Sequence, residues 1–568
     1  MFQFFQHRAA HYLLLLACAA GLTLPNLGRH SLWDVDEGTN AETAREMYES
    51  GDYVVLRFNY IYRDSKPALL FWLQTGSYHL LGVNEFAARF PSAVAAMLNV
   101  LLIYELGRKM FSPGAGLVAG VIQMTAMLVA ITSQLAIPDA LLQLFTTLTF
   151  WCFWNGYVRY APALPPPWRW YVSLGVCCGL AILAKGPIGL VLPALIAGLF
   201  LAWQRQLRFL WNWRALIVLL ACWLIAAPWF ILETIQTRGW FAKGFFITNN
   251  VQRFFRPLEN HRGPWFYHVV TLLLGFAPWS IFIAPTFWHA WPARRIPAAL
   301  DPGYQHQAAR KLLWCWIVAY FVFFTCAATK LPNYLLPLYP ALSLLTADYL
   351  ERWRKLEVVG RSTLLYVGLG ILVCAGFLLA GAMEFANRFG LRFEESSSFK
   401  GWAWLGLVPV LGGLVAAFFA LRQQRARVIA TLGGTALLFA GIIDGAFLPG
   451  LDAWKAPRQL VDQGGSCSRQ EEVRLASYHY TRPSLVFYSQ REVHQLDSAE
   501  EVRAFLQYPL PVYLFIAEPD WQQIGQEKTD SAHVVAQAWD IHRNCRALVI
   551  SNRLPTDQTS SRFVSRAE

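Results

Sequence analysis

Residues 11–28 read HYLLLLACAAGLTLPNLG, and residues 34–46, a few positions later, read DVDEGTNAETARE. The first stretch is apolar over nearly the length of a membrane-crossing helix, which needs about 20 residues. The second stretch places the carboxylates of Asp34, Asp36 and Glu37 where the chain leaves this apolar region. A cleaved signal peptide could begin in the same way, but the run is long for one and further apolar runs follow. The two stretches therefore indicate a membrane helix followed by an acidic external segment.

The rest of the chain repeats this apolar character. Of its 568 residues 55% are hydrophobic and 15% are charged, and the mean hydropathy is +0.34, whereas soluble domains contain about 25% charged residues. This composition predicts a polytopic α-helical membrane protein with about thirteen spans. The net charge of +12 does not indicate nucleic-acid binding, because Lys and Arg are spread over short connections. The expected spans are residues 11–28, 89–110, 114–136, 139–158, 170–186, 188–204, 214–235, 264–288, 311–329, 334–350, 362–384, 402–421 and 428–447.

The orientation of the spans follows from the basic residues in their connections. Lys and Arg occur in every second connection, as at Arg108 and Lys109, and such loops are typically cytoplasmic. This pattern predicts a cytoplasmic N-terminus and an external C-terminus. Two large segments are then external, residues 30–88 and residues 238–263. The first of them contains two stretches typical of helices, TNAETAREMYES and ALLFWLQTGSYHLLG.

The composition changes near residue 451, which predicts a transmembrane domain of residues 1–450 and a C-terminal domain of residues 451–568. Four apolar stretches are typical of short strands, VRLASYHY, SLVFYSQ, PVYLFIAE and RALVIS, and two are typical of helices, EEVRAFLQ and DWQQIGQ. We therefore expect a small α/β domain with a disordered polar tail. Cys467 and Cys545 could form a disulfide in this domain if it is outside the cytoplasm.

Polar and charged side chains gather on the predicted external face, at the ends of apolar stretches. Each one alone is weak evidence, because a charge at the membrane interface costs little, but acids and bases on one face suit transfer chemistry on an anionic lipid. A carboxylate can accept a proton from an attacking hydroxyl, and cations can stabilise a departing phosphate. The expected catalytic residues are Asp36, Glu37 and Asp139. The expected phosphate-binding residues are Lys66, Lys185, Arg253, Arg256 and Arg262, and the expected pocket residues are Tyr62, His261, Lys330 and Tyr334.

Structural roles compete with each of these assignments. Asp36 and Glu37 could favour a helix N-terminus, and Asp139, after a proline, could be an N-cap. The basic residues could anchor the chain at lipid headgroups. A divalent cation could bridge carboxylates and a phosphate, although no metal-binding motif occurs in the sequence. Among whole-protein alternatives, a transporter or flippase would place its charges near the membrane centre, and a membrane-anchored binding protein would not need the acidic segment.

Six motifs, in order, resemble the bacterial aminoarabinose transferase family, which is related to the protein O-mannosyltransferases. They are DVDEGTNAETAREMYESGDYVV, SKPALLFWLQ, LAIPDALLQLFTTL, LAKGPIGLVLP, HRGPWFYHVV and TKLPNYLLPLYPALSLL. The resemblance implies a glycosyltransferase C fold in the bacterial inner membrane, with the active site and C-terminus in the periplasm. It also implies sugar transfer, with inversion, from undecaprenyl phosphate to an acceptor such as a lipid A phosphate, another envelope lipid or glycan, or a protein.

The same resemblance assigns roles to individual residues. It implies that Asp36 is the principal carboxylate of the first loop and that Asp139 is a second functional aspartate. It also implies that Lys66 contacts the lipid phosphate and that Tyr334 lines the site. The chain differs from the family's usual pattern in two places. Thr39 and Asn40 stand where the family has Arg and Tyr, and Ser65 stands where it has Glu, so the sugar and the acceptor are less specifically implied than the reaction.

Overall fold

The larger part of the molecule is a bundle of apolar helices. The computed structural model describes residues 8–160, 166–209, 213–257, 261–291, 302–357, 362–385, 399–464, 472–524 and 532–553. The main helices of the bundle are α1 (Arg8–Thr23), α4 (Glu85–Met110), α5 (Pro113–Thr125), α6 (Met127–Ser133), α7 (Asp139–Tyr160), α8 (Trp168–Lys185), α9 (Ile188–Trp203), α10 (Ala215–Gln236), α13 (Tyr267–Gly275), α14 (Ile283–Ala290), α15 (Pro302–Cys326), α16 (Tyr339–Arg354), α17 (Ser362–Phe385), α18 (Leu407–Leu421), α19 (Arg425–Ile442) and α20 (Leu448–Gly450). Shorter helical segments of 3₁₀ or π type are η2 (Leu24–Asn26), η3 (Leu207–Phe209), η5 (Trp279–Phe282), η6 (Pro332–Leu338), η8 (Phe399–Gly406), η9 (Ile443–Phe447) and η10 (Leu451–Trp454).

The protein is a polytopic helical membrane protein, but the expected number of about thirteen spans is too high. Among the described residues, seven helices are long and apolar enough to cross a membrane, or up to nine if each of two bent pairs is one span. The pairs are α5 with α6, bent by 65°, and α13 with the helical segments that follow it, bent by 110°. Other predicted spans fall on helices such as α9 and α16, which have 16 residues each, fewer than the roughly 20 needed. Apolar runs in the sequence do not reveal such breaks and short helices.

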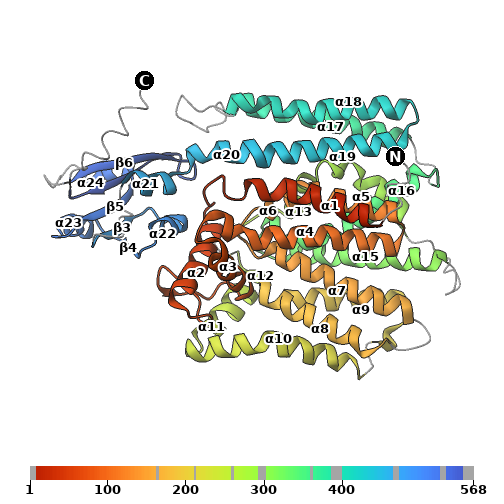
Figure 1. The fold of residues 1–568 in the computed structure, drawn as a ribbon, viewed down its shortest axis with the longest axis horizontal. Coiled ribbons are helices and arrows are strands. Elements are labelled where there is room, and N and C mark those ends of the chain that lie inside the picture. The colour runs from red at the N-terminus through yellow and green to blue at the C-terminus, as the bar shows by residue number, and fades with distance from the viewer. Residues whose placement is uncertain are drawn as a thin grey trace.

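Two segments, within residues 30–88 and 238–257, lie together at one end of this bundle, and their external location stays a prediction. Their elements are α2 (Asp36–Ser50), β1 (Arg57–Phe58), β2 (Ile61–Tyr62), α3 (Leu69–Leu81), α11 (Trp240–Ala242), the π-helix η4 (Lys243–Gln252) and α12 (Arg253–Phe255). Helix α2 begins with two acids in its first turn, which is favourable at a helix N-terminus, and ends at Gly51, whose φ of +68° suits glycine. In Figure 1, α2, α3, α11 and α12 lie at the end of the bundle opposite the label N.

The C-terminal sheet domain, by which we mean the elements from α21 to β7, lies at the same end (Figure 1). Its sheet has the strand order β4-β3-β5-β7-β6 and is mixed, because β3 is parallel to β4 and β5 whereas β7 is antiparallel to β5 and β6. The elements are α21 (Ala456–Gly464), β3 (Arg474–Tyr478), α22 (Pro483–Ser489), β4 (Val493–Leu496), α23 (Ala499–Leu506), β5 (Val512–Ala517), α24 (Glu518–Ile524), β6 (His533–Asp540) and β7 (Cys545–Ser551).

One predicted strand of this domain is wrong. The stretch SLVFYSQ forms helix α22, whose first residue is Pro483, and proline is well placed at the first position of a helix. A short apolar run that is buried on all sides does not distinguish a strand from a helix by periodicity. The predicted strands in VRLASYHY, PVYLFIAE and RALVIS are confirmed as β3, β5 and β7. Cys467 lies outside the described residues, so its pairing with Cys545 stays a prediction.

Candidate active site

A cavity of about 1200 Å³ opens between the bundle and the two segments at its end. Its walls come from the start of α2, from residues 65–67, from the junction of α8 and α9, from the segment 245–255 and from residues 331–337. Apolar side chains make up much of the lining. The sequence-predicted residues in the lining are Asp36, Glu37, Lys66, Lys185, Arg253, His261 and Tyr334. The sequence-predicted residues of the lining therefore come from five separate parts of the chain.

Asp36 is the carboxylate most available to a ligand in this cavity. Its nearest cation is Lys66, whose Nζ lies 3.9 Å from Asp36 Oδ1, and 56% of the Asp36 side chain is exposed. The Lys66 ammonium lowers the pKa of Asp36, and Arg63, Lys185 and Arg253 act in the same direction against burial. Asp36 raises the pKa of Lys66, but burial together with Lys185 and Arg253 outweighs it, so the net shift is downward. The cations thus interact with one another as well as with Asp36, which favours a bound anion among them.

Glu37, next in the chain, has a different environment. Its side chain is buried, and Arg89 of α4 binds both of its oxygens, with Nε–Oε1 and Nη2–Oε2 distances of 2.7 and 2.9 Å. The backbone N–H groups of Trp33 and Ala136 donate to the same carboxylate at 2.8 Å each. Burial raises the pKa of Glu37, and the Arg89 pairing outweighs this effect and lowers it. Because four hydrogen bonds occupy both oxygens, Glu37 is suited to fixing the start of α2.

Asp139 and Lys185 form a second acid–base pair beside the cavity. Asp139 begins α7, and its Oδ1 lies 2.5 Å from the Nζ of Lys185, which ends α8. Lys185 also lies over the ring of Tyr334, 5.5 Å from its centroid. Only Lys185 and Tyr334 of these three line the cavity. Asp139 therefore orients Lys185 from behind, an arrangement that presents an ammonium and an aromatic face to a ligand.

The segment 245–255 supplies a mostly aromatic wall. The lining includes Phe245, Phe246, Phe254 and Phe255 next to Arg253. Phe245 stacks on Phe241 of α11, with a centroid distance of 5.3 Å, and so ties this wall to α10 and α11. An apolar wall next to a cation is suited to a ligand with a long hydrocarbon chain and an anionic head.

Besides Asp139, four predicted residues are not in the lining. Tyr62 is exposed and contacts Trp240, and Arg256 and Arg262 are also exposed. The Nζ of Lys330 donates to the backbone carbonyl of Thr325 at the end of α15. Cations near a helix C-terminus satisfy free carbonyl groups in this way. Contact of these four residues with a ligand stays a prediction.

Arg63 was not predicted from the sequence as a residue of the site. It donates hydrogen bonds to residues at the three positions where the chain differs from the family pattern. Its guanidinium donates to Asn40 Oδ1 at 2.9 Å and to Ser65 Oγ at 3.0 Å, and to the backbone carbonyl of Thr39 at 3.3 Å. Burial lowers the pKa of Arg63 to about 10, against the opposing effects of Asp36 and Asp64. Thr39, Asn40 and Ser65 thus accommodate a buried cation, and this coupling is invisible when each is considered alone.

No metal centre is evident in the part of the chain that the structure describes. Within those residues, no group of three or more His, Cys, Asp or Glu side chains is arranged to hold a metal ion. Asp36 and Glu37 do not share a site, because Glu37 is fully engaged by Arg89 and backbone donors. The predicted divalent cation therefore stays a prediction.

Comparisons with known proteins agree with this geometry. A family model described as dolichyl-phosphate-mannose-protein mannosyltransferase matches residues 9–237. The undecaprenyl phosphate-alpha-4-amino-4-deoxy-L-arabinose arabinosyl transferase of Edwardsiella ictaluri (strain 93-146) is 30% identical over 394 residues, 67% of this chain and 68% of that protein. The equivalent protein of Aeromonas hydrophila subsp. hydrophila is 27% identical over 510 residues, 87% of this chain and 88% of that one. The crystal structure of ArnT from Cupriavidus metallidurans bound to undecaprenyl phosphate superposes with a TM-score of 0.78 at 21% identity, covering 97% of this chain and 100% of that chain.

The helical bundle and the acid–base cavity, together with the Edwardsiella relative, identify the class of protein as a membrane glycosyltransferase. The similarity to the Edwardsiella protein identifies the family within this class. The chain belongs to the undecaprenyl phosphate-aminoarabinose arabinosyl transferase family, and the resemblance read from the sequence motifs is confirmed.

Proposed function

We propose that this protein transfers 4-amino-4-deoxy-L-arabinose from undecaprenyl phosphate to a phosphate of lipid A. One observation carries the proposal: a half-exposed carboxylate, Asp36, faces Lys66, Lys185 and Arg253 in a cavity with an aromatic wall. The cavity has one part suited to a phosphate, one suited to a prenyl chain and one suited to a cationic sugar. The names of its relatives give the same donor.

Donor binding divides between the apolar and the cationic walls. The prenyl chain lies against the phenylalanines of the segment 245–255, where burying each CH₂ group is worth about 0.8 kcal/mol. Its phosphate lies among Lys66, Lys185 and Arg253, which line the cavity together. Arg can bind two phosphate oxygens at once, and Lys acts as a point charge. The 4-amino group of the sugar is protonated at neutral pH, and Asp36 is the carboxylate open to it.

The transfer step forms one bond and breaks one. An oxygen of the acceptor phosphate attacks C1 of the sugar, and the bond between C1 and the donor phosphate oxygen breaks with inversion. The electron pair stays on the departing undecaprenyl phosphate, whose growing negative charge the three cations stabilise. An ionised phosphate acceptor needs no general base, so Asp36 orients the donor. If the acceptor is a hydroxyl group of a glycan or a protein, Asp36 accepts its proton instead.

The location of the reaction is part of the same proposal. We place the cavity and the C-terminal sheet domain on the periplasmic side of the bacterial inner membrane, because the basic connections then face the cytoplasm. Undecaprenyl-linked donors and lipid acceptors both reach this side within the membrane. We also keep the division into residues 1–450 and 451–568 as a proposal, and the sheet of the second part is observed.

Reconstitution tests this function. Wild-type protein in proteoliposomes receives synthetic undecaprenyl phosphate-aminoarabinose with lipid A, total envelope lipid or a Ser/Thr-rich peptide, and products are analysed by mass spectrometry. A mass increase of one aminoarabinose on lipid A supports the proposal. Transfer only to another lipid or to the peptide contradicts the lipid A assignment but keeps the transferase. If the protein binds the donor but transfers its sugar to none of these acceptors, the proposed transfer reaction is contradicted.

A further inference from the structure

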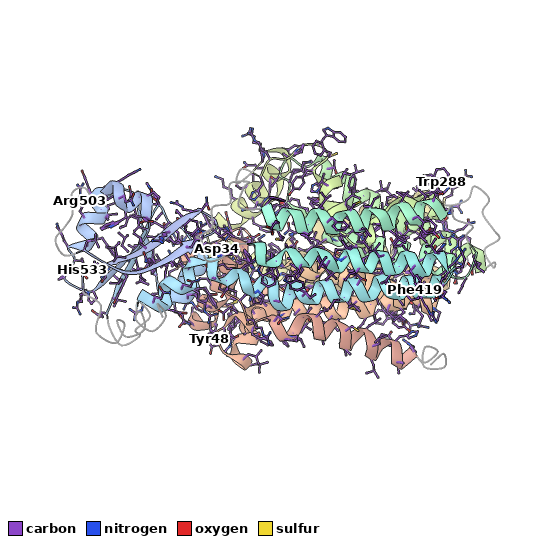
Figure 2. The ribbon with its side chains drawn as sticks, turned by 90° about the horizontal axis from the view of Figure 1, so that it is seen from above. Asp34, Tyr48, Trp288, Phe419, Arg503 and His533 are labelled. Atoms are coloured by element: carbon purple, nitrogen blue, oxygen red, sulfur yellow. The ribbon has the colours of Figure 1, made fainter. Side chains whose placement is uncertain are left out.

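The segment that carries Asp36 into the cavity is held on its other side by the C-terminal sheet domain. Trp33, Asp34, Val35, Asp36 and Glu37 all line the cavity. Figure 2 shows Asp34 where the sheet domain meets the helical bundle. The sequence gives no sign of this contact, because Asp34 and the residues that bind it are about 450 positions apart.

Asp34 uses its carboxylate to bind a single residue, Ser484 at the start of α22. The backbone N–H of Ser484 donates to Asp34 Oδ1 at 2.8 Å, and its hydroxyl donates to Oδ2 at 2.7 Å. Ser484 is buried. Gly38 completes the contact, since a Cβ at this position would lie 2.5 Å from the Ser484 nitrogen. Any larger residue would push α2 and α22 apart.

The three residues before Asp34 are bound by Asp452 and Lys455, which lie just before α21, and by Tyr488 of α22. The backbone N–H of Ser31 donates to Asp452 at 2.7 Å, and Lys455 Nζ donates to the Ser31 carbonyl at 2.9 Å. The Lys455 ammonium also lies 3.8 Å from the ring centroid of Trp33. Tyr488 accepts a hydrogen bond from the backbone N–H of Leu32 at 2.8 Å. Four consecutive residues therefore depend on partners beyond residue 451.

Asp36 consequently lies between two anchors that belong to different parts of the chain. Two residues before it, Asp34 is bound to Ser484 of the sheet domain. Directly after it, Glu37 is bound to Arg89 of α4 in the membrane bundle. The side chain between them is free of a close partner, its nearest cation being 3.9 Å away, and faces the cavity. A shift of either anchor would move the Asp36 carboxylate relative to Lys66.

We propose that Ser484 is a positioning residue for sugar transfer: by binding Asp34, the C-terminal sheet domain sets where Asp36 lies in the donor cavity. The domain is then part of the active site, and neither a separate receptor nor only a stabilising attachment. This inference rests on the proposed transferase function. It predicts that loosening the Ser484 contact slows the chemical step and leaves binding of the donor lipid intact, because the cations that bind its phosphate are on other segments.

Two variants and a matched control test the proposal. Ser484→Ala removes the hydroxyl donor, and Asp34→Ala removes both acceptors. Arg458→Gln is the control, because Arg458 joins the sheet domain to Glu85 of α4 at 2.9 Å without touching residues 31–36. We expect kcat to fall roughly tenfold or more in Ser484→Ala, with the KM for donor within about twofold of wild type, since small misplacements of reacting groups are costly. Arg458→Gln should keep the wild-type kcat.

A conservative replacement separates positioning from chemistry. Asp34→Asn keeps an acceptor for the Ser484 N–H and a partner for its hydroxyl, so its kcat should exceed that of Asp34→Ala by roughly fivefold or more. If Asp34 acted through its charge on the substrate, both variants would be equally slow, which would overturn the proposal. Wild-type kcat in Ser484→Ala, or equal losses in Ser484→Ala and Arg458→Gln, would also overturn it.

Hydrogen–deuterium exchange gives a readout that does not depend on activity. Amides of residues 31–37 should exchange faster in Ser484→Ala than in wild type and in Arg458→Gln, with the bundle helices unchanged. Faster exchange together with no transfer by wild-type protein would contradict the proposed function alone. Unchanged exchange of residues 31–37 in a folded Ser484→Ala variant would overturn the positioning role, whatever the substrate is.

Discussion

Two acid–base pairs with almost the same geometry lie in different parts of the molecule. Asp36 and Lys66 are 3.9 Å apart, and Asp36 is 56% exposed. Arg352, in the last turn of α16, and Glu357, just after that helix, are also 3.9 Å apart, and Glu357 is 54% exposed. The difference is their surroundings, since only the first pair faces the 1200 Å³ cavity and its further cations.

This comparison shows that a loosely paired, exposed acid and base indicate a binding site only when the residues around them do so as well. An exposed pair near the surface contributes about 0–1 kcal/mol to stability, and the Glu357 pair needs no other explanation. The Asp36 pair is equally loose, but Lys185 and Arg253 also act on Asp36 and on Lys66. Several charged side chains around one cavity indicate a binding site for a charged ligand. The predictions for Asp36 and Lys66 that follow use the Glu357 pair as the reference.

The largest effect is expected from Asp36→Asn. Loss of the carboxylate should lower the rate of sugar transfer roughly 100-fold or more, because this group orients the sugar of the donor or accepts the proton of an acceptor hydroxyl group. Glu357→Gln, with the same exposure and the same distance to a cation, should keep the wild-type rate. The rates are measured side by side in proteoliposomes. Similar rates of sugar transfer in the two variants would contradict the claim that only the Asp36 pair takes part in the reaction.

Glu37→Gln should act on stability, in contrast to its neighbour Asp36. The change leaves the buried Arg89 without its carboxylate, which typically costs 3–5 kcal/mol. Thermal unfolding in detergent should show a large decrease in apparent unfolding temperature for Glu37→Gln and little change for Asp36→Asn. Normal stability with lost activity in Glu37→Gln would instead favour the catalytic role predicted from the sequence.

Lys66→Gln should weaken donor binding. Removal of one of the cations around the phosphate is expected to raise the Kd for undecaprenyl phosphate by roughly tenfold, as for loss of a charge-assisted contact. Arg352→Gln, the equivalent change in the reference pair, should leave this Kd unchanged. Binding can be measured by quenching of intrinsic tryptophan fluorescence. Equal Kd values for Lys66→Gln and wild type would show that Lys66 does not bind the donor phosphate.

The pH dependence sharpens the same comparison. Lys66 holds the pKa of Asp36 below its ordinary value, so Asp36 stays ionised to lower pH than a free aspartate, whose pKa is about 3.9. In Lys66→Gln the opposing effect of burial raises that pKa. The acid limb of the kcat/KM profile should therefore move to higher pH in the variant. An unmoved acid limb would show that Asp36 does not control it.

The smallest effect is expected at Glu46, which is not among the residues that line the cavity. Burial and the nearby Glu42 raise the pKa of Glu46. A carboxyl whose pKa is raised on folding binds its proton more tightly in the folded state, so the free energy of unfolding falls as pH rises above about 4.3. Glu46→Gln should remove this dependence and unfold a few degrees higher than wild type near about pH 8. A constant difference between the two proteins across pH would contradict the assignment.

The sequence predicted the parts of the site that depend on local pattern. Asp36, Lys66, Lys185 and Arg253 each stand at the end of an apolar stretch, and all four reach the cavity. The sequence did not distinguish Asp36 from Glu37, because the difference comes from Arg89, which is 52 positions away from Glu37. Contacts at such separations have no local signature.

For the fold, too, the sequence predicted the general class but not the number of spans or the long-range contacts. Composition indicated a polytopic helical membrane protein and a small α/β domain, and both are observed. The number of spans was overestimated, because a 65° bend between α5 and α6 leaves the apolar run in the sequence unbroken. Docking of Ser484 onto Asp34 was not predictable either, since neither residue is unusual in its own segment.

The position of the donor phosphate tests the central claim most directly. We would determine the structure of the protein by electron cryo-microscopy with undecaprenyl phosphate in a lipid nanodisc. The account predicts phosphate density in the cavity, within hydrogen-bonding distance of Lys66 and Arg253, with the prenyl chain along the phenylalanines of the segment 245–255. Phosphate density outside the cavity, with Asp36 and Lys66 unchanged, would contradict it.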